Sequence, residues 1–276
     1  MLKSLLVLLN DARGPYQASD LARQWASSHE ALCVGLSVLD VESVCGDEPV
    51  PMAGMSAKEQ QNQKLLDDVR SRLERVRDRF RSLCTQANVA SQVLEEESRP
   101  ADVIAREAQR CDLVLVDCPQ SRPALGGLST DQLVGVVKHC SRPLVVVPDR
   151  PTSETDVVIA YDGSLQAARA VQAFAQSGLA TDRQVRVVGA AENYVTATRR
   201  VGRAVDFLSR HNISAKAVPI KSDDDPATVV LNHLAVSPAG LLVMGTFGQN
   251  LVREVLFGSV TRRLLEHCPI PIFLSH

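Results

Sequence analysis

The chain has 276 residues, of which 45% are apolar and 22% are charged, which predicts about two folded domains and excludes a disordered protein. Its formal net charge of -2 gives no strong electrostatic attraction to nucleic acid or anionic lipid, so we expect neither partner. No apolar run reaches the roughly 18 residues of a membrane span, and the opening MLKSLLVLLNDARGPY is not typical of a signal peptide, which predicts a cytoplasmic protein.

The first half of the chain alternates apolar runs with amphipathic stretches. Strands are predicted at residues 4–11, 31–40 and 112–118, and a further strand within HCSRPLVVVP at 139–148. Residues 58–84 predict one long amphipathic helix. We interpret its apolar stripe as a face that packs on the core, and this stripe consists of Leu65, Val69, Leu73, Val76, Phe80 and Leu83.

A second half repeats this pattern after a polar, proline-containing segment at residues 149–156. It opens with predicted strands at 156–163 and 184–193. GLLVMGT at 240–246 then matches DLVLVDC, and HCPIPIFLSH at 267–276 matches HCSRPLVVVP, both with the same offset along the chain. RPADVIAREA and DPATVVLNHL each predict a helix with proline in its first turn.

The alternation of strands and helices predicts an α/β fold. We predict two tandem domains, residues 1–149 and 151–276, with the boundary near Pro151. Each domain is expected to hold a doubly wound, Rossmann-like parallel sheet of five strands with helices on both faces. In such a sheet, ligands bind beyond the carboxyl ends of the strands.

The end of one predicted strand in the second half carries a glycine pattern. Gly245 and Gly248 can approach a ligand with bare backbone, because neither has a Cβ atom. After nine residues, Gly258 and Ser259 precede a predicted helix, whose N-terminal amide groups suit a phosphate. The hydroxyl groups of Ser259 and Thr261 are candidate donors to phosphate or ligands of magnesium. Either feature alone is commonly only loop geometry; together they predict an anion-binding cradle.

This pattern resembles the nucleotide-binding signature of the universal stress protein family, G-x2-G-x9-G-(S/T), at each defined position. The resemblance implies tandem domains of adenine-nucleotide α-hydrolase-like fold. It also implies that the aspartate ending the first strand, here Asp162, contacts the nucleoside, although Asp162 could instead cap the helix near Leu165. The resemblance also implies a residue at the end of the second strand that contacts adenine through its backbone. Ala190 is the best match for that residue, and the match could shift by one position along the strand. The remaining implied nucleotide-binding residues are Met244, Gly245, Gly248, Gly258, Ser259, Val260 and Thr261.

The first half lacks this signature at the positions that the repeat aligns with it. There the glycines and serine are replaced by Asp117, Gln120, Thr130 and Asp131. Carboxylates would repel phosphate, and side chains would block close approach of the backbone. We therefore predict one nucleotide site in the second half and a degenerate first half. Another ligand of the first half, covered by residues 46–56, stays open as an alternative.

The resemblance implies an ATP-binding regulatory or sensing module in stress response, with Mg2+ held mainly through the phosphates. The alternatives are a scaffold that binds no nucleotide and a weak ATP hydrolase. We identify no catalytic residue and expect slow hydrolysis at most, because the P-loop motif is absent and His139 and His267 are interpreted as structural. Family members commonly dimerise through their last strands; a homodimer and an intramolecular pseudo-dimer of the two halves are both open.

Overall fold

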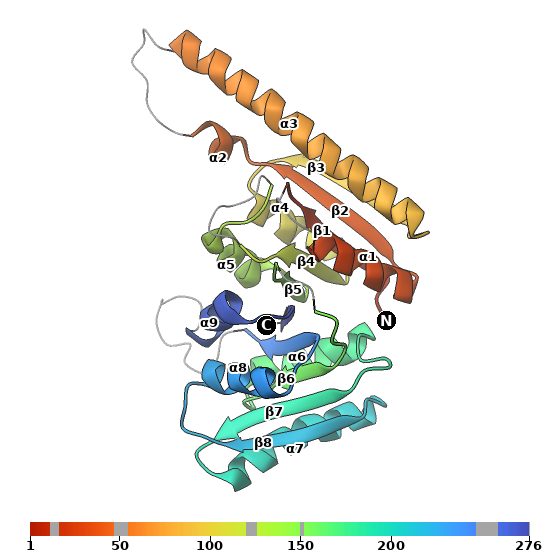
Figure 1. Cartoon of the computed structure of the whole chain (residues 1–276), viewed down its shortest axis with the longest axis vertical. Helices are drawn as coiled ribbons and strands as arrows, with labels where there is room; N and C mark the ends of the chain where they lie inside the picture. Colours follow the sequence, from red (N-terminus) through yellow and green to blue (C-terminus); the bar gives the residue numbers. More distant parts are fainter. Residues whose placement is uncertain (12–16, 47–54, 120–125, 150–151, 247–258, 276) are drawn as a thin grey trace. The chain divides into compact units, whose positions relative to one another are not determined.

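The computed structural model describes most of the chain, namely residues 1–11, 17–46, 55–119, 126–149, 152–246 and 259–275. Two compact units emerge from its internal contacts. One unit contains residues 3–111 and 115–141, and the other contains residues 1–2, 112–114 and 142–276. Figure 1 shows each unit as a sheet layered with helices, coloured along the sequence.

The unit formed by the N-terminal half is a parallel sheet covered on both faces. Its strand order is β3-β2-β1-β4. Right-handed crossovers place α1 and α3 on one face, and α4 and α5, which pack on each other, on the opposite face. The elements are β1 (Ser4–Leu9), α1 (Gln17–His29), β2 (Leu32–Leu39), α2 (Val41–Cys45), α3 (Met55–Gln86), β3 (Ser91–Glu97), α4 (Pro100–Glu107), a 3-10 turn (Ala108–Arg110), β4 (Leu113–Asp117) and α5 (Thr130–His139).

Helix α3 packs on this sheet through most of the predicted stripe. Val69, Leu73, Val76 and Phe80 are all buried. The ring of Phe80 lies against Gly35 of β2, where a Cβ atom would come within 2.8 Å of the ring. Leu65 is 43% exposed, so its predicted place in the core was wrong. The physical reason is the face that the helix turns inward at this level, because Leu66, three residues before Val69, packs against Leu39, Val69 and Leu73 instead. Figure 1 shows the first turns of α3 extending past the ends of β2 and β3.

The unit formed by the C-terminal half has the strand order β5-β10-β9-β6-β7-β8. Its strands are parallel except for β5, which runs antiparallel to β10 with Val146 opposite Ile272. The last strands of the two sequence halves thus pair within this chain. The elements are β5 (Leu144–Val147), β6 (Val157–Ala160), α6 (Leu165–Ser177), β7 (Val185–Ala191), α7 (Tyr194–Arg210), β8 (Ala215–Lys221), α8 (Pro226–Val236), β9 (Leu241–Gly245), α9 (Ser259–His267) and β10 (Ile272–Ser275).

Two helix layers enclose the sheet of this second unit. Helices α6 and α7 contact each other, and α8 and α9 contact each other. Since the chain moves from β6 to β7 to β8 in one direction and from β9 to β10 in the other, right-handed crossovers place the two pairs on opposite faces. Phe174 of α6 and Phe273 of β10 meet edge to face in the core, with ring centroids 6.1 Å apart. Burial of one such side chain contributes roughly 2–3 kcal/mol to folding.

The predicted α/β fold with doubly wound parallel sheets is confirmed. Helices α4 and α8 begin with Pro100 and Pro226 in the first turn, as their sequences predict. The predicted domain boundary near Pro151 lies outside the described residues and stays a prediction. Among the helices that the structure describes, none combines the length and apolar character needed to cross a bilayer.

Candidate functional site

Three adjacent parallel strands of the second unit end at one edge of its sheet. Strand β6 lies between β9 and β7. The register pairs Ile159 with Val243 on one side and Ala160 with Val188 on the other. Asp162, just beyond the end of β6, therefore lies between the ends of β7 and β9. This edge brings the sequence-predicted residues Asp162, Ala190 and Gly245 together.

The turn from β6 into α6 holds Asp162 at the surface. The Asp162 side chain is exposed, and its Oδ1 accepts a hydrogen bond from the backbone amide of Ser164 at 2.9 Å. Gly163 permits this tight turn with φ of 83°. The helix cap is Ser164, whose hydroxyl accepts from the Ala167 amide at 3.1 Å. Asp162 thus shapes the turn while presenting a carboxylate to the edge of the sheet, and Ser164 caps the helix.

Gly245 ends β9 directly against the first turn of α6. A Cβ atom at this position would lie 2.5 Å from the backbone nitrogen of Ala167 and 2.5 Å from the carbonyl carbon of Gln166. Real Cβ atoms do not approach backbone so closely. The glycine is therefore required by the packing of β9 on α6, independently of any ligand. The same contact brings the start of α6 to the end of β9.

The residues around Gly245 are fixed by pairing with β10. Met244 is buried and lies opposite Leu274. Thr246 is 1% exposed, and its amide donates to the Ser275 carbonyl at 2.9 Å, with its hydroxyl 3.3 Å from the same oxygen. These bonds hold the backbone at the end of β9.

The predicted cradle is only partly within the structure's described residues. Gly248 and Gly258 lie outside them. Helix α9 begins at Ser259, one residue before the predicted start. Val260 is half-buried and Thr261 is 4% exposed, so the threonine side chain is enclosed by the fold.

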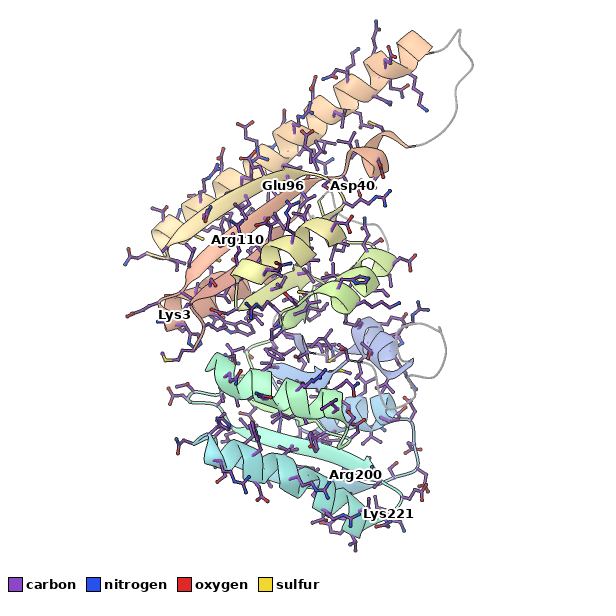
Figure 2. All side chains as sticks on the ribbon, turned by 180° about the vertical axis from the view of Figure 1, so that it is seen from behind. Lys3, Asp40, Glu96, Arg110, Arg200 and Lys221 are labelled. Carbon is purple, nitrogen blue, oxygen red and sulfur yellow. The ribbon has the colours of Figure 1, made fainter. Side chains whose placement is uncertain are left out.

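Ala190 is held near the end of β7 by a side chain that the sequence did not single out. Its carbonyl oxygen accepts a hydrogen bond from Nη1 of Arg200 in α7 at 3.2 Å. Arg200 is half-buried, and its methylene stem passes Gly163 in the neighbouring turn, with Cγ 3.6 Å from the position of a Cβ atom there. Figure 2 shows Arg200 on α7 at the same end of the unit as Lys221, the last residue of β8.

The electrostatics of this edge combine the exposed carboxylates of Asp162 and of Glu192, which directly follows β7, with the arginines Arg200 and Arg203 of α7. Burial raises the pKa of Tyr161, the residue before Asp162; the Asp162 charge raises this pKa further and Arg203 opposes the rise. Tyr161 therefore remains a neutral phenol. Among the described residues no cluster of three or more acidic, histidine or cysteine side chains offers a ready-made metal site.

The equivalent strand end of the first unit is occupied by a carboxylate. Asp117 ends β4 and is the counterpart of Gly245 in the sequence repeat. Its Oδ1 accepts from the Ala18 amide in the first turn of α1 at 2.9 Å, and its Oδ2 accepts from Nδ2 of Asn10 at 2.7 Å. Asn10, just after β1, is 4% exposed. The protein's own anion thus occupies a helix start at this edge.

These features define a doubly wound α/β protein whose candidate site lies beyond the carboxyl ends of parallel strands. Residues 155–276 match the model of the Universal stress protein family. This half of the chain is a universal stress protein domain, and the prediction of that family is confirmed.

Known relatives agree with this assignment. Universal stress protein Slr1230 of Synechocystis sp. (strain ATCC 27184 / PCC 6803 / Kazusa) is 24% identical over 139 residues, which are 50% of this chain and 48% of the relative. The match therefore spans about half the length of that protein. A universal stress protein structure from Archaeoglobus fulgidus DSM 4304 has a TM-score of 0.67 at 16% identity, covering 98% of this chain and 97% of its own. A functionally unknown protein from Pseudomonas aeruginosa PAO1 gives 0.58 at 14% identity, covering 99% and 92%. These two structures show that the fold extends over both halves.

Sequence reasoning missed three residues that shape the site. Ser164 was identifiable, since serine at the start of a helical pattern is a common cap. Thr246 and Arg200 carried no local signal. Their partners, Ser275 and Ala190, are 29 and 10 residues away along the chain and become neighbours only through strand pairing and helix packing.

Proposed function

We propose that this protein binds ATP through its second half and acts as a regulatory or sensing module in a cytoplasmic stress response. One observation carries the proposal: Asp162, Gly245 and the starts of α6 and α9 belong to adjacent strand ends of a universal stress protein domain. The glycine signature that continues from Gly245 supports the same site.

The chemistry of the edge suits the parts of a nucleotide. The Asp162 carboxylate accepts hydrogen bonds from ribose hydroxyls or an amine. The start of α9, with Ser259, Val260 and Thr261, directs amide groups and a positive helix dipole toward the phosphates. Mg2+ would be held mainly by the phosphates, because the described residues supply no metal cluster of their own. We place the site in residues 151–276 and treat residues 1–149 as the degenerate domain.

Isothermal titration with ATP and magnesium tests this function, after bound nucleotide has been removed by extraction. We expect one site per chain. Asp162→Asn, which removes the exposed charge but keeps the turn oxygen, should weaken binding by about tenfold. Gly248→Asp, which introduces a carboxylate into the signature, should abolish it. Asp206→Asn on the exposed surface of α7 is the matched control and should bind as the unmodified protein does.

Each result decides between functions. No binding to the extracted protein would reject the nucleotide site and favour a scaffold. Two sites per chain would contradict the degenerate first half. Release of phosphate from ATP during the titration would assign a hydrolase activity to the same site.

A further inference from the structure

Two buried cysteines of the first unit meet where α3 packs on β2. Cys33 is the second residue of β2, and Cys84 lies near the end of α3. Both are thiols in this structure, and both are 0% exposed. The Cys33 thiol donates a hydrogen bond to the Cys84 sulfur. The proposed binding of ATP uses residues of the second half, so it assigns no role to this pair.

The geometry of the strand and the helix brings the two thiols together. A Cβ atom at Gly35 would come within 2.8 Å of the Phe80 ring. Cys33, two residues before Gly35, lies on the same face of β2, about 6.6 Å along the strand. Cys84, four residues after Phe80, lies on the same side of α3, about 6 Å along the helix. Because α3 connects the parallel neighbours β2 and β3, it runs antiparallel to them, and the two steps nearly coincide.

The turn after α3 holds the backbone on both sides of the pair. The Cys84 carbonyl accepts from the Val89 amide, and the Ala90 carbonyl accepts from the Cys33 amide, each at 2.9 Å. Ser91, the first residue of β3, lies opposite Cys33 in the parallel register. Its hydroxyl also hydrogen-bonds to the Cys84 sulfur. The two sulfur atoms are therefore held in contact by the local fold.

The surroundings of the pair give its two sulfur atoms different character. The hydrogen bond from Cys33 lowers the pKa of Cys84; burial opposes this, and the Ser91 hydroxyl and the charge of Arg23 lower the pKa further. The same hydrogen bond, together with burial, raises the pKa of Cys33. Cys84 is thus suited to attack an oxidant as a thiolate, and Cys33 remains a thiol beside it.

We propose that Cys33 and Cys84 form a disulfide that fastens α3 to β2 when the protein meets a hydroperoxide. The Cys84 thiolate attacks one oxygen of hydrogen peroxide and the O–O bond breaks, which leaves a sulfenic acid on Cys84. The departing hydroxide takes up the proton that Cys84 had released. The Cys33 sulfur then attacks the Cys84 sulfur, and the S–O bond breaks as water leaves with the Cys33 proton. Two thiols are oxidised, and one peroxide is reduced to two molecules of water.

The oxidant reaches the pair through the end of α3. Thr85 and Gln86, which follow Cys84, are exposed. Helix ends open locally at a small cost in free energy, and hydrogen peroxide is small enough to enter such an opening.

Peptide mapping after treatment with hydrogen peroxide tests the proposal. The full chain is treated under native conditions, remaining thiols are blocked with N-ethylmaleimide, and the protein is digested without reductant for mass spectrometry. We expect linked peptides that contain Cys33 and Cys84, lighter by two hydrogen atoms than the two thiol peptides together and separated by dithiothreitol. The oxidised protein should also unfold at a urea concentration higher by about 1 M, because the link closes a long loop of the unfolded chain.

Two variants accompany the unmodified protein. Cys84→Ser should lose both the linked peptides and the rise in urea midpoint. Cys45→Ser is the matched control, because its half-buried thiol ends α2, and it should keep both. Mapping of the unmodified chain decides the outcome even if Cys84→Ser fails to fold.

Several results would overturn the proposal, and none of them involves nucleotide. A link from Cys33 to Cys111 would identify a different pair. An oxidised Cys84 without a link, or oxidation of Cys45 while Cys33 and Cys84 stay reduced, would show that the two sulfur atoms do not react together. A linked protein with an unchanged urea midpoint would contradict the fastening of α3 to β2.

Discussion

The two units differ in the residue at the carboxyl end of an equivalent strand, which is Asp117 at the end of β4 and Gly245 at the end of β9. At β9, Gly245 packs so closely on α6 that no side chain fits, and the helix is capped locally by Ser164. At β4, Asp117 extends a carboxylate to the first turn of α1 and to Asn10. In the first unit, the acceptor for an amide in the first turn of α1 thus comes from strand β4. In the second unit, the acceptor for an amide in the first turn of α6 comes from the cap residue Ser164. At β4, a carboxylate of the protein itself therefore already accepts from a helix start.

The largest expected effect comes from placing the β4 residue at the β9 position. Gly245→Asp would push a side chain into the backbone of Gln166 and Ala167, which has no room for it. We expect the free energy of unfolding to fall by about 3 kcal/mol, as for overpacked sites, and ATP binding to be lost. Urea denaturation measures the first effect and isothermal titration the second.

Gly202→Ala is the control for this substitution. Gly202 lies in α7 with open space around its missing Cβ atom, so alanine should stabilise the protein by roughly 0.5–1 kcal/mol through helix propensity. If Gly245→Asp unfolded at the same urea concentration as the unmodified protein, β9 would not pack on α6 as described.

The sequence predicted the strands and helices of the two units better than the contacts between them. Apolar runs located most of the strands, although not β3 and β8, and proline positions located the starts of α4 and α8, because these depend on local periodicity and backbone chemistry. The constant offset of the sequence repeat identified Asp117 as the counterpart of Gly245. It could not predict that Asp117 binds Ala18, 99 residues away, or that Arg200 binds Ala190. Such contacts depend on how strands and helices meet in three dimensions.

A smaller effect is expected when the anion at β4 is neutralised. Asp117→Asn keeps the shape of the side chain, but its amide group must face one of two donors, the Ala18 amide or the Asn10 side chain. We expect a loss of about 2 kcal/mol in the free energy of unfolding, measured with urea, because a partly buried donor loses its acceptor.

Asp68→Asn in α3 controls for the change in net charge. Asp68 is exposed, so its substitution should change stability by less than about 0.5 kcal/mol. Equal stability of Asp117→Asn and Asp68→Asn would show that the Asp117 carboxylate does not stabilise the start of α1.

The smallest expected effect concerns Ser164, which caps α6 in the second unit, whereas Asp117 accepts from the start of α1 in the first unit. Ser164→Ala leaves the Ala167 amide without its acceptor and should cost about 1 kcal/mol, measured by urea denaturation. Ser164→Thr retains a hydroxyl group and should recover most of that stability. ATP affinity should change little in Ser164→Ala, because the bond to Asp162 comes from the backbone amide of residue 164, which alanine keeps. A loss of affinity as large as that of Asp162→Asn would mean that the serine hydroxyl itself contacts the nucleotide, and the two strand ends would then differ in ligand chemistry as well as in capping.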